Sequence, residues 1–289
     1  MARDELIAAC WTSAGACTPM SMVNDDRSPV PIRERVQAVA EAGFMGFGIR
    51  RSDLMDVKAH LGYPAFRALL DEFGIKHLEL EFLEGWHLPA GEARSVSDQH
   101  RAQLLEASGE LGARHIKLGG DFTPIPWNAQ RMGEELGVLA EQAAATGARV
   151  GLEPMPFADV QTPEMALEAV EIASHPAAGL CLDVWHIYRA GLPVDSVASI
   201  PVDRIVSVEL DDAVEEVVGT MLEDTFNGRR FPGEGDIDLP AFVRAIKSTG
   251  FSGPWGVEML STDFRKLPVQ EATRLAFETS MRYLDGVGD

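Results

Sequence analysis

Four acidic residues directly follow four short apolar segments, and this pattern is the clearest sign of chemistry in the chain. They are Glu153 (after VGL), Asp183 (after GLCL), Glu209 (after IVSV) and Glu258 (after WGV). Short apolar segments of this kind are typical of buried parallel strands. A buried carboxylate must be paired, hydrogen-bonded or bound to a metal, and four that meet repel one another unless a cation lies among them. The pattern therefore predicts a site for a divalent metal ion.

The ligand atoms in this set are all oxygens, which suit Mn²⁺ or Mg²⁺ better than Zn²⁺, an ion that favours nitrogen and sulfur. Taken alone, each acid also fits a solvated loop or a helix cap, as Asp183 would for a helix that follows it. His186 lies three residues past Asp183, where a neutral imidazole can hydrogen-bond a substrate hydroxyl or carbonyl. His115 and Lys117 alternate on another apolar segment, so both are expected to point inward. Trp86, after a further segment, is expected at the same end of the fold.

These residues can meet only in a fold that brings many strand ends together, and the order of the segments predicts one. Strands are expected at residues 6–10, 46–49, 76–81, 115–118, 149–153, 179–182, 205–210 and 254–259. Helices are expected at residues 31–41, 63–73, 96–111, 127–145, 163–174, 194–200, 239–248 and 269–284. Strict alternation predicts a parallel sheet, and eight units predict a closed (β/α)8 TIM barrel, with residues 1–289 as one domain. An open doubly wound sheet is the alternative, but the segment WTSAGACTPM after the first strand has no GxGxxG turn.

The charge and composition of the chain limit its partners. It has 25 Lys and Arg against 45 Asp and Glu, a formal net charge of −20, which disfavours nucleic-acid backbones and anionic membranes. Three cysteines, an odd number, indicate a reducing compartment. The N-terminus MARDELIAAC does not resemble a signal peptide, and no apolar run reaches the ~18 residues of a membrane span. We expect a cytoplasmic protein with a small-molecule partner; homo-oligomer formation stays open.

The residues described so far resemble those of the sugar phosphate isomerase/epimerase superfamily, which has a xylose-isomerase-like barrel, and especially its ketose 3-epimerases and inosose and dehydroshikimate dehydratases. The resemblance is carried by the DxxH pair, Asp183 and His186, and by the segment GRRFPGEGDID, residues 228–238. It implies one metal ion held by Glu153, Asp183, Glu209 and Glu258. It also implies that Arg229 contacts the substrate. Residues 212–235 form a connection longer than the ~12–15 residues beyond which loops are commonly functional, so we expect this loop to cover the site.

Two features depart from the family pattern. The third ligand is usually His, or sometimes Gln, where this chain has Glu209; Asp211 or Asp212 is therefore an alternative ligand. The dehydroshikimate-dehydratase branch carries His two residues past the fifth-strand Glu and Lys two residues past the seventh-strand ligand. This chain has Met155 and Asp211 at those places, which argues against that particular reaction.

The resemblance implies an enzyme that abstracts a proton next to a carbonyl in a keto sugar or related polyol, through a metal-stabilised enediolate, and so isomerises or epimerises it. Glu153 and Glu258 would exchange the proton from opposite sides. The residues expected to bind the substrate are His186, Arg229, Lys117 and Trp86. The alternative is a metal-dependent dehydratase or lyase acting on a keto-cyclitol, a dehydroshikimate-like compound or a 3-keto-glycoside.

Two other classes of protein share this type of barrel or could keep it without catalysis. An endonuclease of the same barrel type would need a His-rich cluster of three metals and a basic face, and seven His with a net charge of −20 disfavour it. A non-catalytic partner subunit would be free to lose the metal ligands. Metal binding therefore distinguishes such a subunit from an enzyme.

Overall fold

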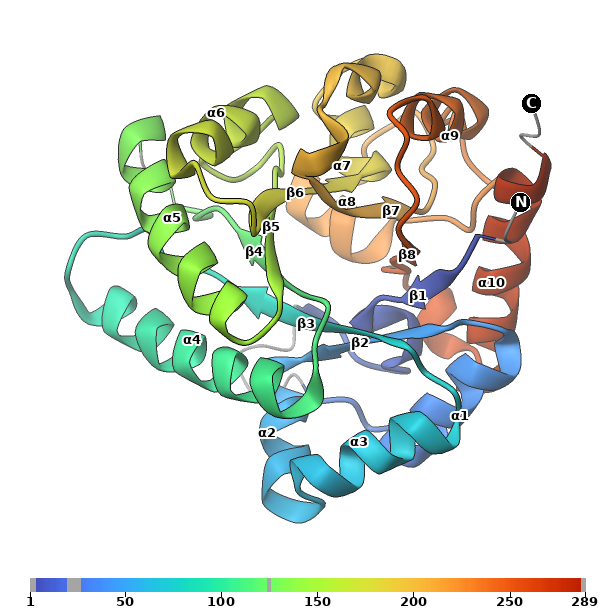
Figure 1. Cartoon of the computed structure of the whole chain (residues 1–289). Helices are drawn as coiled ribbons and strands as arrows, with labels where there is room; N and C mark the ends of the chain where they lie inside the picture. The colour runs from blue at the N-terminus through green and yellow to red at the C-terminus, as the bar shows by residue number, and fades with distance from the viewer. Residues whose placement is uncertain (1–3, 20–26, 124–125, 287–289) are drawn as a thin grey trace.

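The structure, a computed structural model, describes residues 4–19, 27–123 and 126–286. Eight parallel strands form a closed barrel in which the order along the chain is also the order around the ring (Figure 1). They are β1 (Leu6–Ala8), β2 (Gly46–Arg50), β3 (His77–Leu83), β4 (His115–Gly119), β5 (Arg149–Glu153), β6 (Ala178–Asp183), β7 (Ile205–Leu210) and β8 (Trp255–Val257). Leu6 of β1 lies opposite Trp255 of β8, and this pairing closes the ring. The closed barrel expected from the sequence is confirmed.

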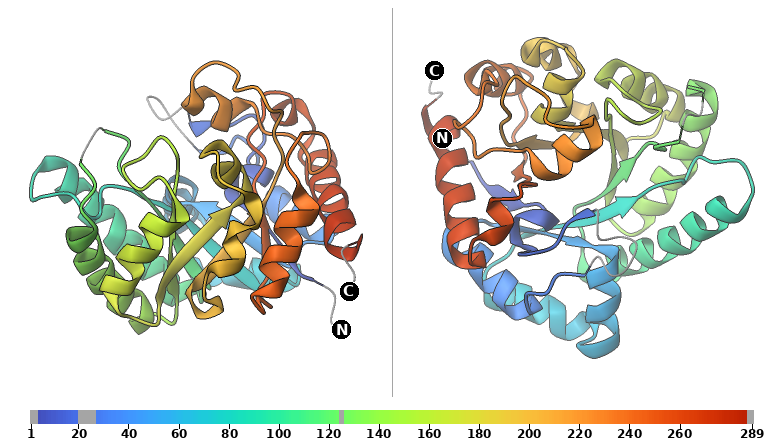
Figure 2. Two further views of the ribbon diagram at one scale, coloured as in Figure 1. Left: turned by 90° about the horizontal axis from the view of Figure 1, so that it is seen from above. Right: turned by 180° about the vertical axis from the view of Figure 1, so that it is seen from behind.

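The longer helices surround the ring of strands, as the three views show (Figures 1 and 2). The α-helices are α1 (Ile32–Ala42), α2 (Arg51–His60), α3 (Tyr63–Glu72), α4 (Glu92–Leu111), α5 (Ala129–Ala145), α6 (Pro163–Ala173), α7 (Val184–Arg189), α8 (Met221–Asn227), α9 (Leu239–Ser248) and α10 (Val269–Gly286). Parallel neighbours require a crossover between strands, and these helices provide it, so all eight strands end at the same face. In the described part of the chain, no helix has the length and apolar character needed to cross a membrane.

Local signals in the sequence explain many helix boundaries. α1 ends at Gly43, whose φ of 110° is a left-handed conformation that glycine adopts without strain. At the start of α6, the side chain of Thr162 accepts a hydrogen bond from the amide of Met165. Asp238 caps α9 in the same way. Because these signals are local, the helices expected near residues 31–41, 163–174 and 239–248 are found there.

Three helices have no counterpart among those that the sequence predicts. α7 and α8 have six and seven residues, too few to display a helical period. α2 begins directly after β2, with no loop to separate the two patterns. The start of α8 does carry a readable signal, the capping box formed by Thr220 and Glu223. The helix expected at residues 194–200 is wrong in type, because Val194–Ser199 is a 3-10 helix.

Polar side chains occupy the inside of the barrel in two successive layers. Glu79 of β3 and His115 of β4 form the lower layer, with 2.6 Å between Oε2 of the acid and Nε2 of the imidazole. Glu81 and Lys117, two residues further along the same strands, belong to the layer above. All four side chains are buried. His115 and Lys117 both point into the barrel, as strand alternation predicts.

Candidate active site

The carboxyl ends of β5 to β8 bring four acidic side chains together. Glu153 and Asp183 are the last residues of β5 and β6. Glu209 is the next-to-last residue of β7, and Glu258 directly follows β8. One oxygen from each carboxylate lies within 4.8 Å of the others, and all four side chains are buried. The structure therefore joins the four acids that the sequence singles out; we call them the four-acid group.

Asp183 has two roles, because its two carboxylate oxygens point at different partners. Oδ1 accepts a hydrogen bond of 2.7 Å from the amide of Trp185 and so caps α7. Oδ2 lies 2.6 Å from Nη1 of Arg229, inside the site. The helix cap and the site residue, which the sequence presented as alternatives, are thus the same side chain.

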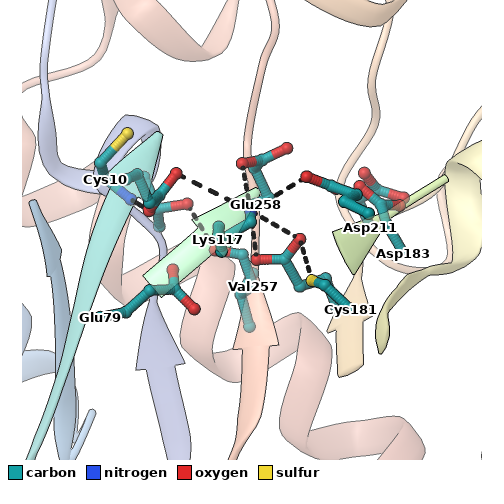
Figure 3. A network of polar contacts seen from close by, with 12 residues as sticks. Cys10, Glu79, Lys117, Cys181, Asp183, Asp211, Val257 and Glu258 are labelled. Carbon is teal, nitrogen blue, oxygen red and sulfur yellow. Dashed lines mark hydrogen bonds and ion pairs between the residues drawn. The ribbon is translucent and has the colours of Figure 1, made fainter. Parts of the chain in front are cut away.

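Lys117 of β4 places its ammonium among these acids. Nζ lies 2.9 Å from both carboxylate oxygens of Glu209 and 3.2 Å from Oε1 of Glu258. One oxygen each of Glu81 and Glu153 is 3.7 Å away. Figure 3 shows Lys117 beside Glu258 in the middle of the polar network. Burial disfavours the ammonium, but the surrounding carboxylates outweigh it and raise the pKa of Lys117 well above its usual value.

Arg229 is a second buried cation in contact with the four-acid group. Besides Nη1 on Asp183, its Nη2 lies 3.0 Å from Oε2 of Glu258. The guanidinium also contacts the carboxylate of Asp211. The long loop after β7 therefore does deliver Arg229 to the site, where the guanidinium binds acids of the protein itself.

Negative charge at this end of the barrel is only partly compensated. Burial raises the pKa of Glu153 to about 8 and that of Glu81 to about 7, although Lys117 acts in the opposite direction on both. Burial also raises the pKa values of Glu209 and Asp211 well above their usual range. Oε1 of Glu153 has no hydrogen-bond partner among the residues that the structure describes. An excess of buried carboxylates and an unpaired oxygen fit the binding of a divalent cation.

His186 lies on α7, just beyond Asp183, and lines the same cavity as the acids. Its Nε2 is 3.6 Å from Oε1 of Glu153 and 3.4 Å from Nη2 of Arg229. Burial, reinforced by the charge of Arg229, lowers the pKa of His186 well below its usual value. The imidazole is therefore neutral at pH 7 and suited to hydrogen-bonding a small polar molecule.

A cavity of about 60 Å³ lies over the four-acid group. Of the predicted residues, it is lined by Lys117, Glu153, His186, Arg229 and Glu258. Residues that the sequence reasoning missed include Trp11, Arg50, Phe157 and Thr225. Arg50 is the last residue of β2, so the strand-end rule that found the acids could also have found it. Phe157 lies in the connection between β5 and α6, and Thr225 lies on the short helix α8. Neither residue is at a strand end, so the same rule does not find them.

Trp86 was expected to bind substrate, but the structure does not bring it to the cavity. Its indole Nε1 donates a hydrogen bond of 2.8 Å to the carbonyl oxygen of Gly119. The neighbouring His87 lies 2.8 Å from Oδ2 of Asp159. These contacts tie the connection that follows β3 to the end of β4 and to the connection that follows β5. The sequence placed Trp86 after the right strand, but the direction of its side chain depends on the tertiary packing of those connections.

The two alternative metal ligands have other partners. Both oxygens of Asp212 accept hydrogen bonds from backbone amides of the loop that follows β7, including those of Gly233 and Gly235. Asp212 therefore organises the loop that carries Arg229. Asp211 binds the guanidinium of Arg229 and does not belong to the four-acid group.

The fold and the site together define a class of protein. The chain is a parallel eight-stranded barrel with acidic side chains and a cavity at the carboxyl ends of its strands, where barrels of this kind carry their active sites. Residues 36–285 match the family described as xylose isomerase-like TIM barrel. This chain belongs to that family.

Comparison with individual proteins agrees with this assignment. A 3-dehydroshikimate dehydratase from Pseudomonas putida is 29% identical over 244 residues, which cover 82% of this chain and 37% of that protein. An inosose isomerase from Bacillus subtilis is 30% identical over 145 residues, which cover 50% of this chain and 51% of that protein. The chain thus matches about half or less of the length of these relatives. A crystal structure of the IolI protein with a bound zinc atom has the same fold, with a TM-score of 0.83 at 20% identity and 99% of both chains covered.

Proposed function

We propose that this chain is a divalent-metal-dependent isomerase or epimerase that acts on a keto sugar or a related polyol by removing a proton next to a carbonyl. The observation that carries the proposal is the convergence of the four-acid group, with ligand atoms within 4.8 Å of one another, beside a cavity. Isomerase and dehydratase are the activities named for two relatives. Both kinds of reaction can start from the loss of a proton next to a carbonyl.

The metal ion would be held by carboxylate oxygens of Glu153, Asp183 and Glu258, with Glu209 as the fourth ligand that the family pattern implies. When bound, a divalent ion supplies electrophilic stabilisation of the oxygen that becomes negative as the proton leaves. We propose Mn²⁺ or Mg²⁺ because the donor atoms are all oxygens. The IolI crystal structure holds zinc, so elemental analysis of the purified protein should include all three metals.

Glu153 and Glu258 form the proposed proton-transfer pair. They come from β5 and from the end of β8, so they approach the cavity from different sides of the barrel. Oε1 of Glu153, which has no hydrogen-bond partner in the described residues, can accept a proton without breaking an existing bond. Removal of the proton on one face and its return on the other gives an epimer. Its return to the neighbouring carbon gives an isomer.

The remaining side chains around the cavity would orient the substrate. The neutral imidazole of His186 can hydrogen-bond a hydroxyl or a carbonyl, whereas Arg229 and Lys117 offer positive charge to an oxygen that becomes negative. Met155 and Phe157 form an apolar part of the cavity wall and so reduce the access of water.

A lyase is the second candidate, because the match to a dehydratase covers 82% of this chain. Loss of a β-hydroxyl or a glycosyl group from the same enediolate would make the enzyme a dehydratase or lyase. Met155 and Asp211, each two residues past a proposed metal ligand, disfavour dehydroshikimate as the substrate. A keto-cyclitol or a 3-keto-glycoside would then be the substrate class.

The test is a panel of keto sugars, inososes and 3-keto-glycosides followed by NMR in D₂O with added Mn²⁺. The proposal predicts deuterium at the carbon next to the carbonyl, together with signals of a new epimer or isomer. An unsaturated product or a released aglycone would instead identify the lyase. Absence of exchange with every compound, in a protein shown to hold metal, would overturn both candidates. The double variant Glu153→Gln/Glu258→Gln is the matched control.

We also propose a reducing compartment such as the cytoplasm for this protein. Cys10, Cys17 and Cys181 are all buried, and Cys10 and Cys181 are free thiols, as expected where thiols stay reduced. Titration of the unfolded protein with a thiol reagent, in the absence of reductant, should count three thiols per chain.

A further inference from the structure

We propose that Glu81 is a third proton-transfer residue, which carries a proton from a hydroxyl oxygen of the substrate to the neighbouring carbonyl oxygen. This inference rests on the proposed function, in which Glu153 and Glu258 move the protons on carbon and no residue moves those on oxygen. A carbonyl group can shift to the next carbon only if protons move on both kinds of atom. Epimerisation restores the carbonyl where it was and needs no such transfer, so the inference narrows the reaction to isomerisation.

Glu81 occupies a separate part of the cavity wall. It lies on β3, which is opposite β7 in the ring of eight strands, and its side chain is buried. It lines the cavity together with Glu153 and Glu258 but does not belong to the four-acid group. Glu84, the remaining acid of the described cavity wall, is partly exposed. Glu81 is therefore the buried acid of this wall that is available for a task other than metal binding.

The two carboxylate oxygens of Glu81 have different surroundings. Oε1 accepts a hydrogen bond of 2.8 Å from the amide of Cys10. This close approach requires a glycine at Gly48, because a Cβ atom there would lie 2.7 Å from Oε1 and 2.6 Å from the amide nitrogen. Oε2 lies 3.7 Å from Nζ of Lys117, beyond the length of a hydrogen bond. One oxygen is thus fixed, and the other can exchange a proton with a molecule in the cavity.

Lys117 directs its hydrogen bonds to other acids. Nζ is 2.9 Å from both oxygens of Glu209 and 3.2 Å from Oε1 of Glu258. Glu81 and Glu153 lie at the same longer distance of 3.7 Å. These two acids therefore have the same relation to the ammonium, and neither is hydrogen-bonded to it.

A carrier between two oxygens must be able to donate and to accept a proton near neutral pH. Burial raises the pKa of Glu81 to about 7; Lys117 opposes this effect, and the neighbouring Glu79 adds to it. Lys117 is less suitable, because the carboxylates around it outweigh its burial and hold its pKa well above the usual value. Burial lowers the pKa of His186 well below its usual value, so its imidazole is a poor acceptor of a second proton. The geometry and the proton affinity of Glu81 thus favour the same role.

The transfer balances without a further reactant. As Glu153 or Glu258 takes the proton on carbon, the C–H electron pair forms a carbon–carbon double bond, and the carbonyl oxygen takes a proton from Oε2 of Glu81. Oε2 then takes the proton of the neighbouring hydroxyl, whose O–H electron pair becomes the new carbon–oxygen double bond. The proton taken from carbon returns to the former carbonyl carbon. Both carboxyl groups end in their starting state, and the substrate class is an α-hydroxy ketone.

The test separates proton exchange on carbon from movement of the carbonyl group. Glu81→Gln removes the acidic proton, while its amide oxygen can still accept from the amide of Cys10. The panel of keto sugars and inososes is followed by NMR in D₂O, with Mn²⁺ bound to each protein. Formation of the isomer should fall by about 10²–10⁴-fold, whereas deuterium exchange next to the carbonyl should change by less than about 10-fold. Equal losses of both, or loss of neither, would overturn the inference.

His186→Gln is the matched control, because His186 lines the same cavity and offers a second neutral group that could move a proton between oxygens. Its imidazole is expected to orient the substrate, so this variant should lose exchange and isomer formation together. If His186→Gln separated the two and Glu81→Gln did not, the imidazole would be the carrier, and the assignment to Glu81 would be wrong.

Glu81→Asp keeps the inference testable if the glutamine variant does not fold. Its carboxyl group is withdrawn from the cavity by one methylene, so isomer formation should again fall more than deuterium exchange does. An equal fall in both would contradict a role at the substrate oxygens.

The wild-type protein distinguishes this inference from the function on which it rests. An epimer or an unsaturated product, formed without any isomer, would overturn the role of Glu81 and leave proton removal next to a carbonyl intact. Absence of deuterium exchange with every compound, in a protein shown to hold metal, would overturn the proposed function and this inference together.

Discussion

The two polar layers inside the barrel share strands β3 and β4, and the upper layer also receives acids from β5 to β8; the charges of the two layers are balanced differently. In the lower layer, Glu79 meets His115 at 2.6 Å, and both side chains are fully buried. Burial lowers the pKa of His115 well below its usual value, so this imidazole is neutral at pH 7. In the upper layer, the ammonium of Lys117 faces several carboxylates. Burial there raises the pKa of Glu153 to about 8. An inward polar side chain is therefore not functional by itself; an excess of charge beside a cavity distinguishes the upper layer.

The largest expected effect tests whether chemistry belongs to the upper layer. Glu153→Gln and Glu258→Gln should each lower turnover by about 10²–10⁴-fold, because an amide cannot accept the proton. Deuterium exchange followed by NMR should show that each variant still labels only the epimer for which its base is retained. Turnover near the wild-type rate in both variants would place the base elsewhere, with the neutral imidazole of His186, which lines the cavity, as the next candidate.

Glu79→Gln is the control for this experiment in the lower layer. It keeps the size of the side chain at a position that does not line the cavity. After correction for the folded fraction, this variant should still exchange deuterium into both epimers. Loss of exchange comparable to that of the upper-layer variants would remove the distinction between the layers.

Removal of the metal ion should lower the stability of the folded protein, because the ion is expected to bind the acids of the upper layer. A ligand present at 1,000 times its dissociation constant stabilises the native state by about 4 kcal/mol. EDTA should therefore lower the Tm measured by calorimetry, and Mn²⁺ should restore it. An unchanged melting curve after exhaustive chelation, with no metal found by elemental analysis, would contradict the metal site.

Mutation of the lower layer should reduce the free energy of unfolding and leave metal binding intact. His115→Leu leaves the carboxylate of Glu79 buried without its imidazole partner, and should reduce the free energy of unfolding by about 3 kcal/mol. Urea denaturation measures this change, and the shift of Tm caused by EDTA should persist in the variant. If the shift disappeared, the lower layer would be part of the metal site after all.

Arg229→Ala should reduce catalysis less than the substitutions of Glu153 and Glu258 do, when activity is measured at saturating Mn²⁺. Loss of a charged hydrogen-bond donor is expected to raise KM or lower kcat by about 10–100-fold. Metal content should not fall, because Arg229 is a cation that contacts Asp183 and Glu258 and competes with an ion for them. Loss of metal on this substitution would show that Arg229 supports the ligands and not the substrate.

The smallest expected effect concerns the loop that carries Arg229. Thr220→Ala removes the capping box at the start of α8 and should lower stability by about 1 kcal/mol. Thr220→Ser retains the hydroxyl and should behave like the wild type in urea denaturation. Because the cap lies outside the four-acid group, neither variant should change the affinity for Mn²⁺.

Much of the fold and part of the site could be predicted because the relevant signals are local. Alternating apolar segments, helix caps such as Thr162 and C-terminal glycines such as Gly43 act over a few residues. The eight strands were found for this reason, and so were the acids at four strand ends. Helices of six or seven residues, such as α7 and α8, escaped because a helical period needs a longer stretch.

The sequence by itself determined that Lys117 points into the barrel, since strand alternation sets which face a residue occupies. It also determined that four acids lie at strand ends, because each follows a short apolar segment: Glu153, Asp183, Glu209 and Glu258. Only the tertiary structure decided the partners of these charges. Lys117 and Glu209 are 92 residues apart in the chain, and they meet because β4 and β7 face each other across a closed ring. The register of the strands sets the height of each side chain inside the barrel, and packing sets its direction, as Trp86 shows by turning to Gly119. Both depend on contacts between distant segments, which a local pattern does not contain.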